Sequence, residues 1–555
     1  MGATIVDLFR KNVEESPDRV WLRNCSSVTE GCWSWRQASE EINSVSAWVE
    51  RQVGSEGAAI GLLASNCAHW AMADLAIISS GNVTVPLFTS SPKETVEYVI
   101  EFSGVKVLFV GRADNWADVS QVIDESVIVV TLPGVDITAD LDASIAHIKW
   151  EEIVRAMSGA RPKHSGEASD VVSIVFTSGT TGLPKGVVQS HESMILPMLR
   201  HSEVYASRPN PRFLSYLPLA HIAERQLVLV QSLVQCAEIS FNESLIHLKR
   251  DMSTCRPNFF FGAPRVWEQL REGILALFGS QELLNLALER DGEGLKTVIK
   301  ASLGLQDADL LAVGSAPAPR ELIQWFDVLG MQVLEGYGQT EAMSIAANTA
   351  NESRAGSIGK PYPGVELLVS DSGELLCKAE GVAVGYYKSF EDTAKTFVNG
   401  WVHTGDTARI DEDGFVYLVG RVKDYFKTIQ GKFVSPYPIE SAFQGSDLVD
   451  QVCLLGRGYS KTIIVCVLSE KSKGMSRDII ESELRSVIEK INLDLERHAR
   501  VGAALIDGEK WTINNTVLTP TLKIRREKIE ELYGDRAEKL SRESAERKAT
   551  LIEWC

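Results

Sequence analysis

The stretch IVFTSGTTGLPKGVVQSHE, residues 174–192, concentrates residue types that could hold a phosphate group. Its glycines allow backbone amides to approach an anion closely, and its hydroxyl side chains and lysine add donors and positive charge. It is not a Walker A sequence, because no glycine immediately precedes a lysine that is followed by serine or threonine. We therefore predict a phosphate-binding loop of another type, with an ordinary glycine- and threonine-rich turn as the alternative.

Strand-like and helical patterns alternate along most of the chain and must position this loop. The loop itself is expected between a strand, SIVFTSG, and a following helix, SMILPMLRHS. Other short apolar runs end in glycine, proline or serine and predict further strands, whereas SPKETVEYVIEFSG predicts a helix. Such alternation is typical of α/β folds with mostly parallel strands, whose connecting loops carry ligands.

The pattern changes after about residue 365. ELLVSDSGELLCKA and DEDGFVYLVGRVKD have the pattern of antiparallel strands, and Asp413-Gly414 predicts a two-residue hairpin turn. From Arg421 onward the chain has its own strands and an amphipathic helix. We therefore expect an α/β protein with a large N-terminal domain, residues 1–420, that has parallel-rich sheets and a small β-barrel-like subdomain. A small α+β C-terminal domain, residues 421–555, is expected to follow it.

Composition limits the classes of function. The length of 555 residues predicts two or more domains, and 45% apolar with 23% charged residues is ordinary for a globular protein. A net charge of −18 argues against nucleic acid as a partner. Nine cysteines without a CxxC pair are typical of a reducing compartment. Since neither a secretory signal nor a transmembrane stretch is visible, we expect a cytoplasmic enzyme.

Five motifs in the expected order resemble those of the adenylate-forming superfamily, which includes acyl-CoA synthetases, adenylation domains of peptide synthetases and firefly luciferase. The loop FTSGTTGLPKG is the first. GYGQTEA (336–342), WVHTGD (401–406), GRVKD (420–424) and LTPTLKIRR (518–526) follow it, so the resemblance spans nearly the whole chain. Three stretches are most similar to long-chain fatty acyl-CoA synthetases: YLPLAHIAERQ (216–226), GKFVSPYPIE (431–440) and LTPTLKIRR.

The resemblance implies how ATP is held. The 177–185 loop would grip the β- and γ-phosphates, Thr340 the α-phosphate, and Glu341 a Mg²⁺ ion. Asp406 would accept hydrogen bonds from both ribose hydroxyls with help from Arg421, and GSAP (314–317) and Tyr337 would flank the adenine. The expected nucleotide-binding residues are Thr177, Ser178, Gly179, Thr180, Thr181, Lys185, Gly314, Ser315, Ala316, Tyr337, Gly338, Gln339, Thr340, Asp406 and Arg421.

The resemblance also implies a mobile C-terminal domain. Lys523 would bridge the α-phosphate and the carboxylate during adenylation, although short-chain members usually have glycine where Leu522 stands. Lys423 occupies the hinge position, and Gly431 lies where the pantetheine of CoA would pass close to the backbone. His221 either lies near the entry of the acyl chain or packs beneath the loop. The expected catalytic residues are Lys523, Glu341, Thr181 and His221.

The chemistry implied is activation of a carboxylic acid. A carboxylate is a poor electrophile, and joining it to AMP supplies a good leaving group, provided that the anions are neutralised and held in line. The expected reaction converts a medium- or long-chain fatty acid to acyl-AMP and then to acyl-CoA, with release of AMP and pyrophosphate. ATP, Mg²⁺ and coenzyme A are the expected cofactor and co-substrates.

Other interpretations stay open. The protein could be an acyl-AMP ligase that passes the acyl group to an acyl carrier protein, or a ligase for an aryl or other carboxylate. A nucleotide-binding relative without activity is disfavoured by the presence of Lys523, Glu341 and Asp406. Oligomeric state and peripheral contact with a membrane are left open.

Overall fold

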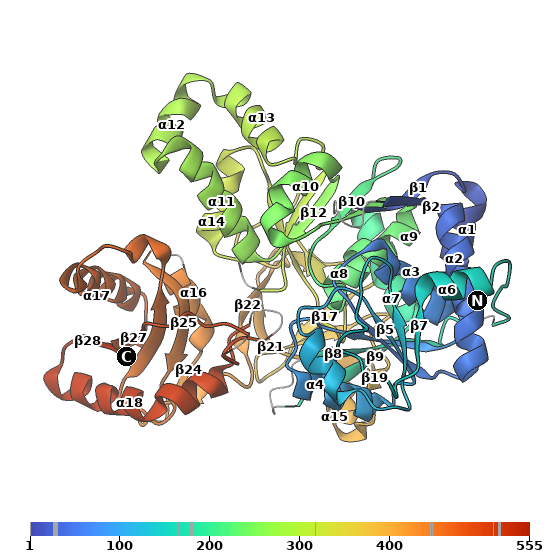
Figure 1. The fold of residues 1–555 in the computed structure, drawn as a ribbon. Helices are drawn as coiled ribbons and strands as arrows, with labels where there is room; N and C mark the ends of the chain where they lie inside the picture. The colour runs from blue at the N-terminus through green and yellow to red at the C-terminus, as the bar shows by residue number, and fades with distance from the viewer. Residues whose placement is uncertain are drawn as a thin grey trace.

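The computed structural model describes residues 2–25, 31–164, 166–177, 183–316, 318–444, 446, 448–513, 515–519 and 523–555. A large N-terminal part and a smaller C-terminal part lie side by side and are joined near β22 (Val416–Arg421) (Figure 1). The expected mixed α/β architecture is confirmed.

Two large sheets with mainly parallel pairing form the N-terminal part. The first has the order β16-β15-β14-β13-β12-β10-β11-β1-β2, and the second has the order β19-β9-β8-β4-β3-β5-β6-β7. The first comprises β1 (Val20–Asn24), β2 (Gly31–Ser34), β10 (Arg212–Ser215), β11 (Glu238–Phe241), β12 (Phe259–Gly262), β13 (Leu310–Val313), β14 (Val333–Tyr337), β15 (Ala346–Ala347) and β16 (Lys360–Pro361). The second comprises β3 (Ala59–Leu63), β4 (Val83–Leu87), β5 (Val107–Val110), β6 (Ile128–Thr131), β7 (His147–Lys149), β8 (Val171–Thr177), β9 (Lys185–Ser190) and β19 (Gly385–Tyr386). Central strands such as VLFV in β5 are buried on both faces, as expected for parallel strands covered by helices.

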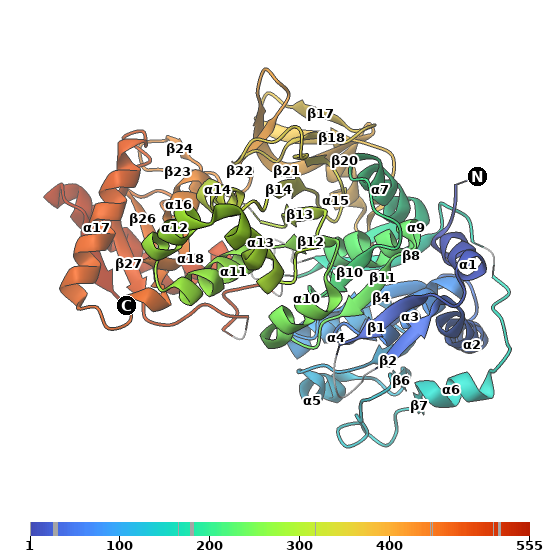
Figure 2. The same cartoon turned by 90° about the horizontal axis from the view of Figure 1, so that it is seen from above.

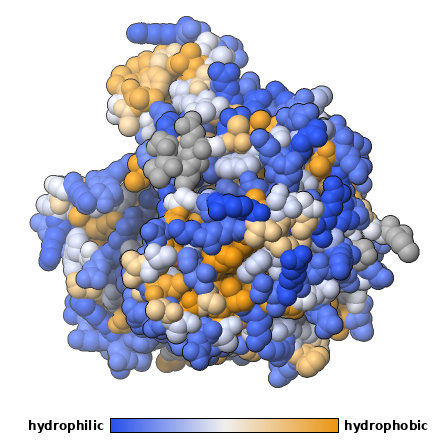
Figure 3. All heavy atoms as spheres, turned by 45° about the vertical axis from the view of Figure 1, so that its right-hand side comes forward, coloured by the Kyte–Doolittle hydropathy of each residue, from blue (hydrophilic) through white to orange (hydrophobic). Residues whose placement is uncertain are grey.

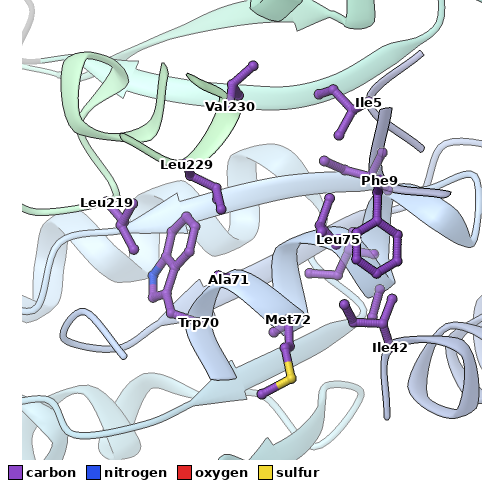
Figure 4. Close-up of a cluster of buried hydrophobic side chains, with 14 of the residues drawn as sticks. Ile5, Phe9, Ile42, Trp70, Ala71, Met72, Leu75, Leu219, Leu229 and Val230 are labelled. Carbon is purple, nitrogen blue, oxygen red and sulfur yellow. The ribbon is translucent and has the colours of Figure 1, made fainter. Parts of the chain in front are cut away.

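A layer of helices separates the two sheets. Every residue of α3 is buried, as expected for a helix that is apolar all round. Its side chains share one core with both sheets, and Figure 4 shows Trp70 and Leu75 of α3 among residues of the neighbouring helices. The layer contains α1 (Ile5–Glu15), α2 (Trp35–Val53), α3 (Ala68–Ser79), α6 (Trp150–Ala156), α7 (His191–Val204), α8 (Ile222–Glu224), the π-helix η2 (Arg225–Val230) and α9 (Gln231–Gln235).

Further helices cover the outer faces of the two sheets. On the second sheet these are α4 (Lys93–Ser103) and α5 (Trp116–Val119). On the first they are α10 (Leu248–Cys255), α11 (Pro264–Phe278), α13 (Gly292–Ser302) and α14 (Arg320–Val328). The molecule is therefore layered, with helices outside and between the two sheets.

The helical hairpin of α12 (Gln281–Arg290) and α13 projects from this body (Figure 1). Leu283, Leu286 and Val298 of this hairpin are exposed. Figure 3 shows apolar surface at the top of the view. Within the described ranges, each helix is either too short or too polar to cross a lipid bilayer.

A small antiparallel sheet stands where we expected a barrel-like subdomain. Its strands pair as the open path β17-β18-β21-β20, with β22 added to β21, and β22 extends toward the C-terminal part (Figure 2). The strands are β17 (Glu366–Val369), β18 (Glu374–Lys378), β20 (Phe397–Val398), β21 (Trp401–Ile410) and β22, and α15 (Phe390–Thr396) precedes β20. The predicted hairpin between β21 and β22 is present, but the prediction that Asp413 and Gly414 form its two-residue turn is wrong. The amide of Gly414 donates to the carbonyl of Asp411, so Glu412 and Asp413 are central, and Gly414 follows them at φ 86°.

The C-terminal part is α+β, as predicted. One sheet has the order β25-β26-β27-β28, with α16 and α17 packed on one face and α18 on the other. Its elements are β23 (Phe426–Lys427), β24 (Phe433–Val434), α16 (Pro436–Gln444), β25 (Val449–Leu455), β26 (Thr462–Leu468), α17 (Arg477–Leu493), β27 (Val501–Asp507), α18 (Arg526–Arg547) and β28 (Leu551–Trp554). That the domain begins at residue 421 stays a prediction.

A buried ion pair within the central layer is hydrogen-bonded to two strands of the second sheet. Arg225, at the start of η2, places Nε 2.9 Å from Asp74 Oδ2, and its Nη1 donates to the hydroxyl of Ser173 at 2.5 Å. The hydroxyl of Thr84 donates to Asp74 Oδ1 at 2.7 Å. Since the side chains of the pair are only 1% and 3% exposed, neither charge has water as an alternative partner.

Asp74→Ala is expected to destabilise the fold by about 3–5 kcal/mol, because it leaves the Arg225 guanidinium buried without its counter-charge. The loss in free energy of unfolding is measured from the transition of the N-terminal part in chemical denaturation. Asp309→Ala is the control, since the Arg208–Asp309 pair is 41% and 40% exposed and its removal should cost at most about 1 kcal/mol. Similar losses for the two variants would contradict the role assigned to the buried pair.

Candidate active site

The two ends of the predicted phosphate loop belong to antiparallel strands. β8 ends at Thr177 and β9 begins at Lys185, and these two residues are directly paired. The hydroxyl of Thr177 donates to the carbonyl of Lys185 at 3.4 Å. The expected strand–loop–helix order was wrong, because the antiparallel strand β9 intervenes before α7 begins at His191. Ser178, Gly179, Thr180 and Thr181 lie outside the described residues.

Two residues that sequence reasoning missed, Tyr386 and Asp392, contact the loop lysine. Lys185 Nζ lies 2.7 Å from Asp392 Oδ1, and this hydrogen bond lowers the pKa of the carboxyl. Nζ also lies 5.6 Å from the ring centre of Tyr386, whose hydroxyl donates to Glu341 Oε1 at 2.6 Å. Tyr386 reaches this place because β19 pairs with β9, a contact between distant segments that no local pattern shows.

Neighbouring parallel strands bring two other expected segments together. Val313 of β13 lies opposite Glu335 of β14, so the residues that follow both strands meet at the carboxyl edge of the sheet. A Cβ added to Gly314 would lie 2.9 Å from the carbonyl oxygen of Gly336, which makes glycine necessary there. Ser315 adopts φ 63°, and Ala316 follows it. These segments therefore form one closely packed wall.

Asp406 is the centre of a hydrogen-bond network and is only 6% exposed. Its Oδ2 accepts from the hydroxyl of Tyr337 at 2.5 Å and from Gln339 Nε2 at 2.6 Å. Its Oδ1 lies 2.7 Å from Arg421 Nε, across the direct pairing of β21 with β22. Burial and the charge of Asp406 raise the pKa of Tyr337, so its hydroxyl stays protonated and donates.

The turn after β14 is fixed through its backbone. Gln189 Nε2 donates to the carbonyl of Thr340 at 2.7 Å, and the amide of Ala383 donates to the carbonyl of Glu341 at 2.9 Å. A Cβ at Gly338 would lie 3.0 Å from Met343 Sδ, so the turn is also tightly packed. The carboxylate of Glu341 is thereby held at a defined place, with Oε1 bonded to Tyr386.

Lys523 belongs to the C-terminal part and faces the N-terminal site. It keeps contact with solvent, yet enclosure by the surrounding protein and the charge of Arg421 lower its pKa, while Asp406 and Glu341 act in the opposite direction. Its own backbone is fastened locally, since its amide donates to Thr519 Oγ1 at 3.0 Å. The structure thus brings Lys523 into the electrostatic range of residues from the other motifs.

His221 caps the short helix α8. Its Nδ1 accepts from the amide of Ala223 at 3.3 Å, so the neutral ring carries its proton on Nε2. Burial and the nearby charge of Lys523 lower the pKa of His221 to about 4, which keeps the ring neutral at pH 7. Nδ1 of His221 therefore has a local structural role, in line with the interpretation of this residue as packing beneath the loop. A role toward the acyl chain stays a prediction.

The predicted hinge and CoA-binding positions lie in turns of the backbone. Lys423 follows β22 within a turn closed by the amide of Asp424 and the carbonyl of Arg421 at 3.1 Å. Gly431 lies between β23 and β24 at φ 73°, and a Cβ there would meet no atom within 4 Å. Glycine is thus favoured by the left-handed backbone and not by crowding. The hinge role of Lys423 and the CoA-binding role of Gly431 both stay predictions.

These elements define a two-part α/β enzyme fold with its motif residues gathered where the parts meet. The family model described as AMP-binding enzyme matches residues 9–387, and the model described as AMP-binding enzyme C-terminal domain matches residues 423–544. The chain belongs to the AMP-binding enzyme family.

Curated relatives match over most of their length. A long-chain-fatty-acid–CoA ligase of Mycobacterium bovis, FadD15, is 25% identical, with 94% of each chain covered. The peroxisomal long chain acyl-CoA synthetase 7 of Arabidopsis thaliana is 24% identical, with 98% of this chain and 87% of the relative covered. Long-chain-fatty-acid–CoA ligase 6 of Mus musculus is 27% identical, with 87% and 78% covered.

Solved structures share the fold. The adenylation domain of a carboxylate reductase from Mycobacterium chelonae superimposes with a TM-score of 0.83 at 22% identity, covering 97% of this chain and 91% of that chain. The anthranilate CoA ligase AuaEII in complex with anthranoyl-AMP gives a TM-score of 0.78 at 20% identity, covering 96% and 97%. The A-PCP didomain of carboxylic acid reductase from Segniliparus rugosus gives 0.80 at 20% identity, covering 99% and 83%.

Asp406→Ala is expected to raise the KM for ATP by about tenfold or more, since hydrogen bonds to a charged group contribute about 1.5–3 kcal/mol. Initial rates at varied ATP measure it. Asp411→Ala is the matched control, because Asp411 lies in the turn at the other end of the β21–β22 hairpin and pairs with Arg354. An unchanged KM for ATP in Asp406→Ala would contradict a nucleotide-binding role.

Proposed function

We propose that this protein is an ATP-dependent fatty acid–CoA ligase that forms AMP. The fatty acid carboxylate attacks the α-phosphorus of ATP and releases pyrophosphate, and the thiol of CoA then attacks the acyl carbon and releases AMP. The observation that carries the proposal is the bonding of Asp406 to Tyr337, Gln339 and Arg421, which brings three of the family's motifs together. The charges of Asp406 and Glu341 also act on Lys523 of the C-terminal part. The long-chain fatty acid ligases among the relatives support the substrate class.

The loop hairpin would hold the triphosphate. In the protein alone, the charge of Lys185 is met by Asp392, and a triphosphate is a stronger anionic partner than one exposed carboxylate. Binding would therefore move Lys185 from Asp392 to the β- and γ-phosphates. Ser178, Gly179, Thr180 and Thr181 would add donors from the turn. Thr340, whose backbone is fixed by Gln189, would meet the α-phosphate.

The nucleoside would lie against the closely packed wall formed by Gly314–Ala316 and Tyr337. Asp406 would bind the ribose, and its existing bonds limit how. A carboxylate has about four lone-pair positions, and three are taken by Tyr337, Gln339 and Arg421. The first ribose hydroxyl would use the remaining position on Oδ1. The second ribose hydroxyl would compete with Gln339 for Oδ2 of Asp406, so the side chain of Gln339 would lie beside the ribose.

A divalent cation fits beside Glu341. Oε1 of this carboxylate is bonded to Tyr386, so Oε2 faces away from that bond as an oxygen ligand. No group of three or more metal-binding side chains occurs in the described part of the chain. That suits Mg²⁺, which is usually held by one or two carboxylates together with substrate phosphates. When bound, the ion would neutralise phosphate charge during adenylation.

Lys523 would act between the two substrates. An ammonium that contacts both the carboxylate and the α-phosphate offsets the repulsion between them, and it stabilises the charge that develops during the transfer. Enclosure by the surrounding protein and the charge of Arg421 lower the pKa of Lys523, whereas the anionic side chains of Asp406 and Glu341 favour its cationic form. The hinge at Lys423 would then carry Lys523 away so that CoA can approach past Gly431.

The acceptor of the acyl group distinguishes this proposal from its neighbours. Structures that share the fold include an aryl-CoA ligase and an adenylation domain linked to a carrier domain. The curated relatives described above are named as CoA ligases or acyl-CoA synthetases, which favours CoA. The first experiment below distinguishes a fatty acid–CoA ligase from an enzyme that transfers the acyl group to a carrier protein and from an enzyme that activates an aryl acid.

With ATP and Mg²⁺, the protein is expected to convert fatty acids to acyl-CoA and to release AMP and pyrophosphate. The measurement follows AMP and thioester over a panel of fatty acids from C6 to C20, with benzoate and anthranilate as aryl controls, each with and without CoA. Acyl-AMP that accumulates without thioester would point to a carrier-protein acceptor. Absence of any acid-dependent pyrophosphate exchange would rule out the proposed function.

Lys523→Ala is expected to lower adenylation by about a hundredfold or more, the scale found when one preorganised donor is removed from a transition state. It should leave thioester formation from supplied acyl-AMP nearly unchanged. Pyrophosphate exchange and thioester formation are measured separately. Lys528→Ala is the control, because Lys528 lies nearby in α18 and pairs with Glu531 on the surface. Equal loss of both half-reactions would contradict the role of Lys523.

A further inference from the structure

An ion pair joins the two parts of the protein at a point away from the hinge. Arg265 lies in the first turn of α11, and Asp450 lies near the start of β25. Arg265 Nη2 is 3.0 Å from Asp450 Oδ1, and the side chain of Asp450 is only 11% exposed. A carboxylate so far removed from water requires a partner of opposite charge. The pair therefore fixes one part of the molecule against the other.

Each member of this pair also has a second partner within its own part. Arg265 Nη1 donates to Glu268 Oε2 at 3.1 Å, one turn further along α11. Lys510 Nζ lies 3.2 Å from Asp450 Oδ2. The four charges alternate in sign across the junction. If the two parts separate, Arg265 keeps Glu268 and Asp450 keeps Lys510, so opening leaves no buried charge alone.

On the N-terminal side, the pair is attached to the wall of the candidate nucleotide site. α11 follows β12 directly, and Gly262 of β12 lies opposite Val313 of β13. The indole of Trp267, two residues after Arg265, donates to the carbonyl of Ala312 at 3.2 Å. The helix that carries Arg265 is therefore packed against β13, which leads directly to the segment that begins at Gly314.

On the C-terminal side, the pair is attached to the segment that carries Lys523. Trp511, beside Lys510, exchanges two hydrogen bonds with Gln451, at 3.1 and 2.8 Å. Further along β25, the carbonyl of Leu454 accepts from Arg526 Nη1 at 2.5 Å. Arg526 also pairs with Glu440 at 2.8 Å. A displacement of Asp450 would therefore move Lys523, three residues before Arg526, as part of one body.

We infer that Arg265 and Asp450 are positioning residues that hold the C-terminal domain in the orientation required for adenylation. A hinge at Lys423 alone would allow the C-terminal domain to rotate. A second contact between the two parts defines the orientation in which Lys523 approaches the site. For the second half-reaction the pair would open, with Glu268 and Lys510 taking over as partners. This inference rests on the proposed function, because it divides the reaction into the two steps described above.

Asp450→Asn and Arg265→Gln are expected to slow acid-dependent pyrophosphate exchange by about two- to fivefold, the range of equilibrium shift that a partly exposed pair supplies. Thioester formation from supplied acyl-AMP should be unchanged or faster. Arg265→Lys should recover part of the loss, because it keeps the charge. The double variant should be no slower than either single variant, since both remove one and the same contact.

The matched control is Arg23→Gln. Arg23 pairs with Glu238 at 2.8 Å with exposures of 42% and 23%, and both residues lie within the N-terminal part. This variant should leave both half-reactions unchanged. A loss shared equally by both half-reactions in Asp450→Asn, or additive losses in the double variant, would reduce the pair to a structural contact and overturn the inference.

A second measurement separates failure of this inference from failure of the proposed function. Fluorophores on cysteines introduced at Val298 and Leu493, which are 63% and 80% exposed, report the distance between the two parts. The exposed Cys32 and Cys555 are first replaced by serine. Asp450→Asn should shift the distance distribution toward separated states in the absence of any substrate. An unchanged distribution would overturn the inference even if the enzyme is active, whereas a shifted one would support the pair even if no acid is adenylated.

Discussion

The ion pair between Asp406 and Arg421 is the interaction around which the site is arranged. It follows from strand pairing, because β21 and β22 set the two residues directly opposite each other. Asp406 faces inward to Tyr337 and Gln339, while Arg421 ends β22 at the point where the chain leaves for the C-terminal part. One pair thus connects the carboxylate of the candidate nucleotide site with the junction, and the charge of Arg421 reaches Lys523.

Charged side chains of the candidate site have partners within the protein. Lys185 is matched by Asp392, Asp406 by Arg421, and the carboxylate of Glu341 accepts a hydrogen bond from Tyr386. A partly buried site that bound a triphosphate only through isolated cations would be costly in the absence of ligand. Paired charges lower that cost, and under the proposed function binding would be an exchange of partners. The same principle applies at the Arg265–Asp450 pair, where each charge has an alternative partner within its own part.

The sequence predicted the fold class and the main elements because their signals are local. Apolar runs such as VLFV in β5 and the amphipathic pattern of α17 need no knowledge of distant residues. It failed where pairing partners are far apart. β9 was missed as a strand after a glycine-rich loop. Tyr386 comes near Lys185 through the β9–β19 pairing, and Asp392 contacts Lys185 from α15, which follows β19. The turn between β21 and β22 was placed correctly, but its central residues are Glu412 and Asp413, one position earlier than predicted.

The stretch YLPLAHIAERQ illustrates why resemblance and role must be separated. Glu224 accepts from the amide of Tyr216 at 2.9 Å, and burial raises the pKa of Glu224 to about 8. Arg225 is committed to Asp74 and Ser173, and His221 caps α8 through Nδ1. These polar side chains therefore build the layer between the two sheets. The contacts seen here are contacts of the scaffold, and the role of His221 toward the acyl chain stays a prediction. The acyl preference must be set by apolar residues that contact the chain, and the fatty acid panel probes those directly.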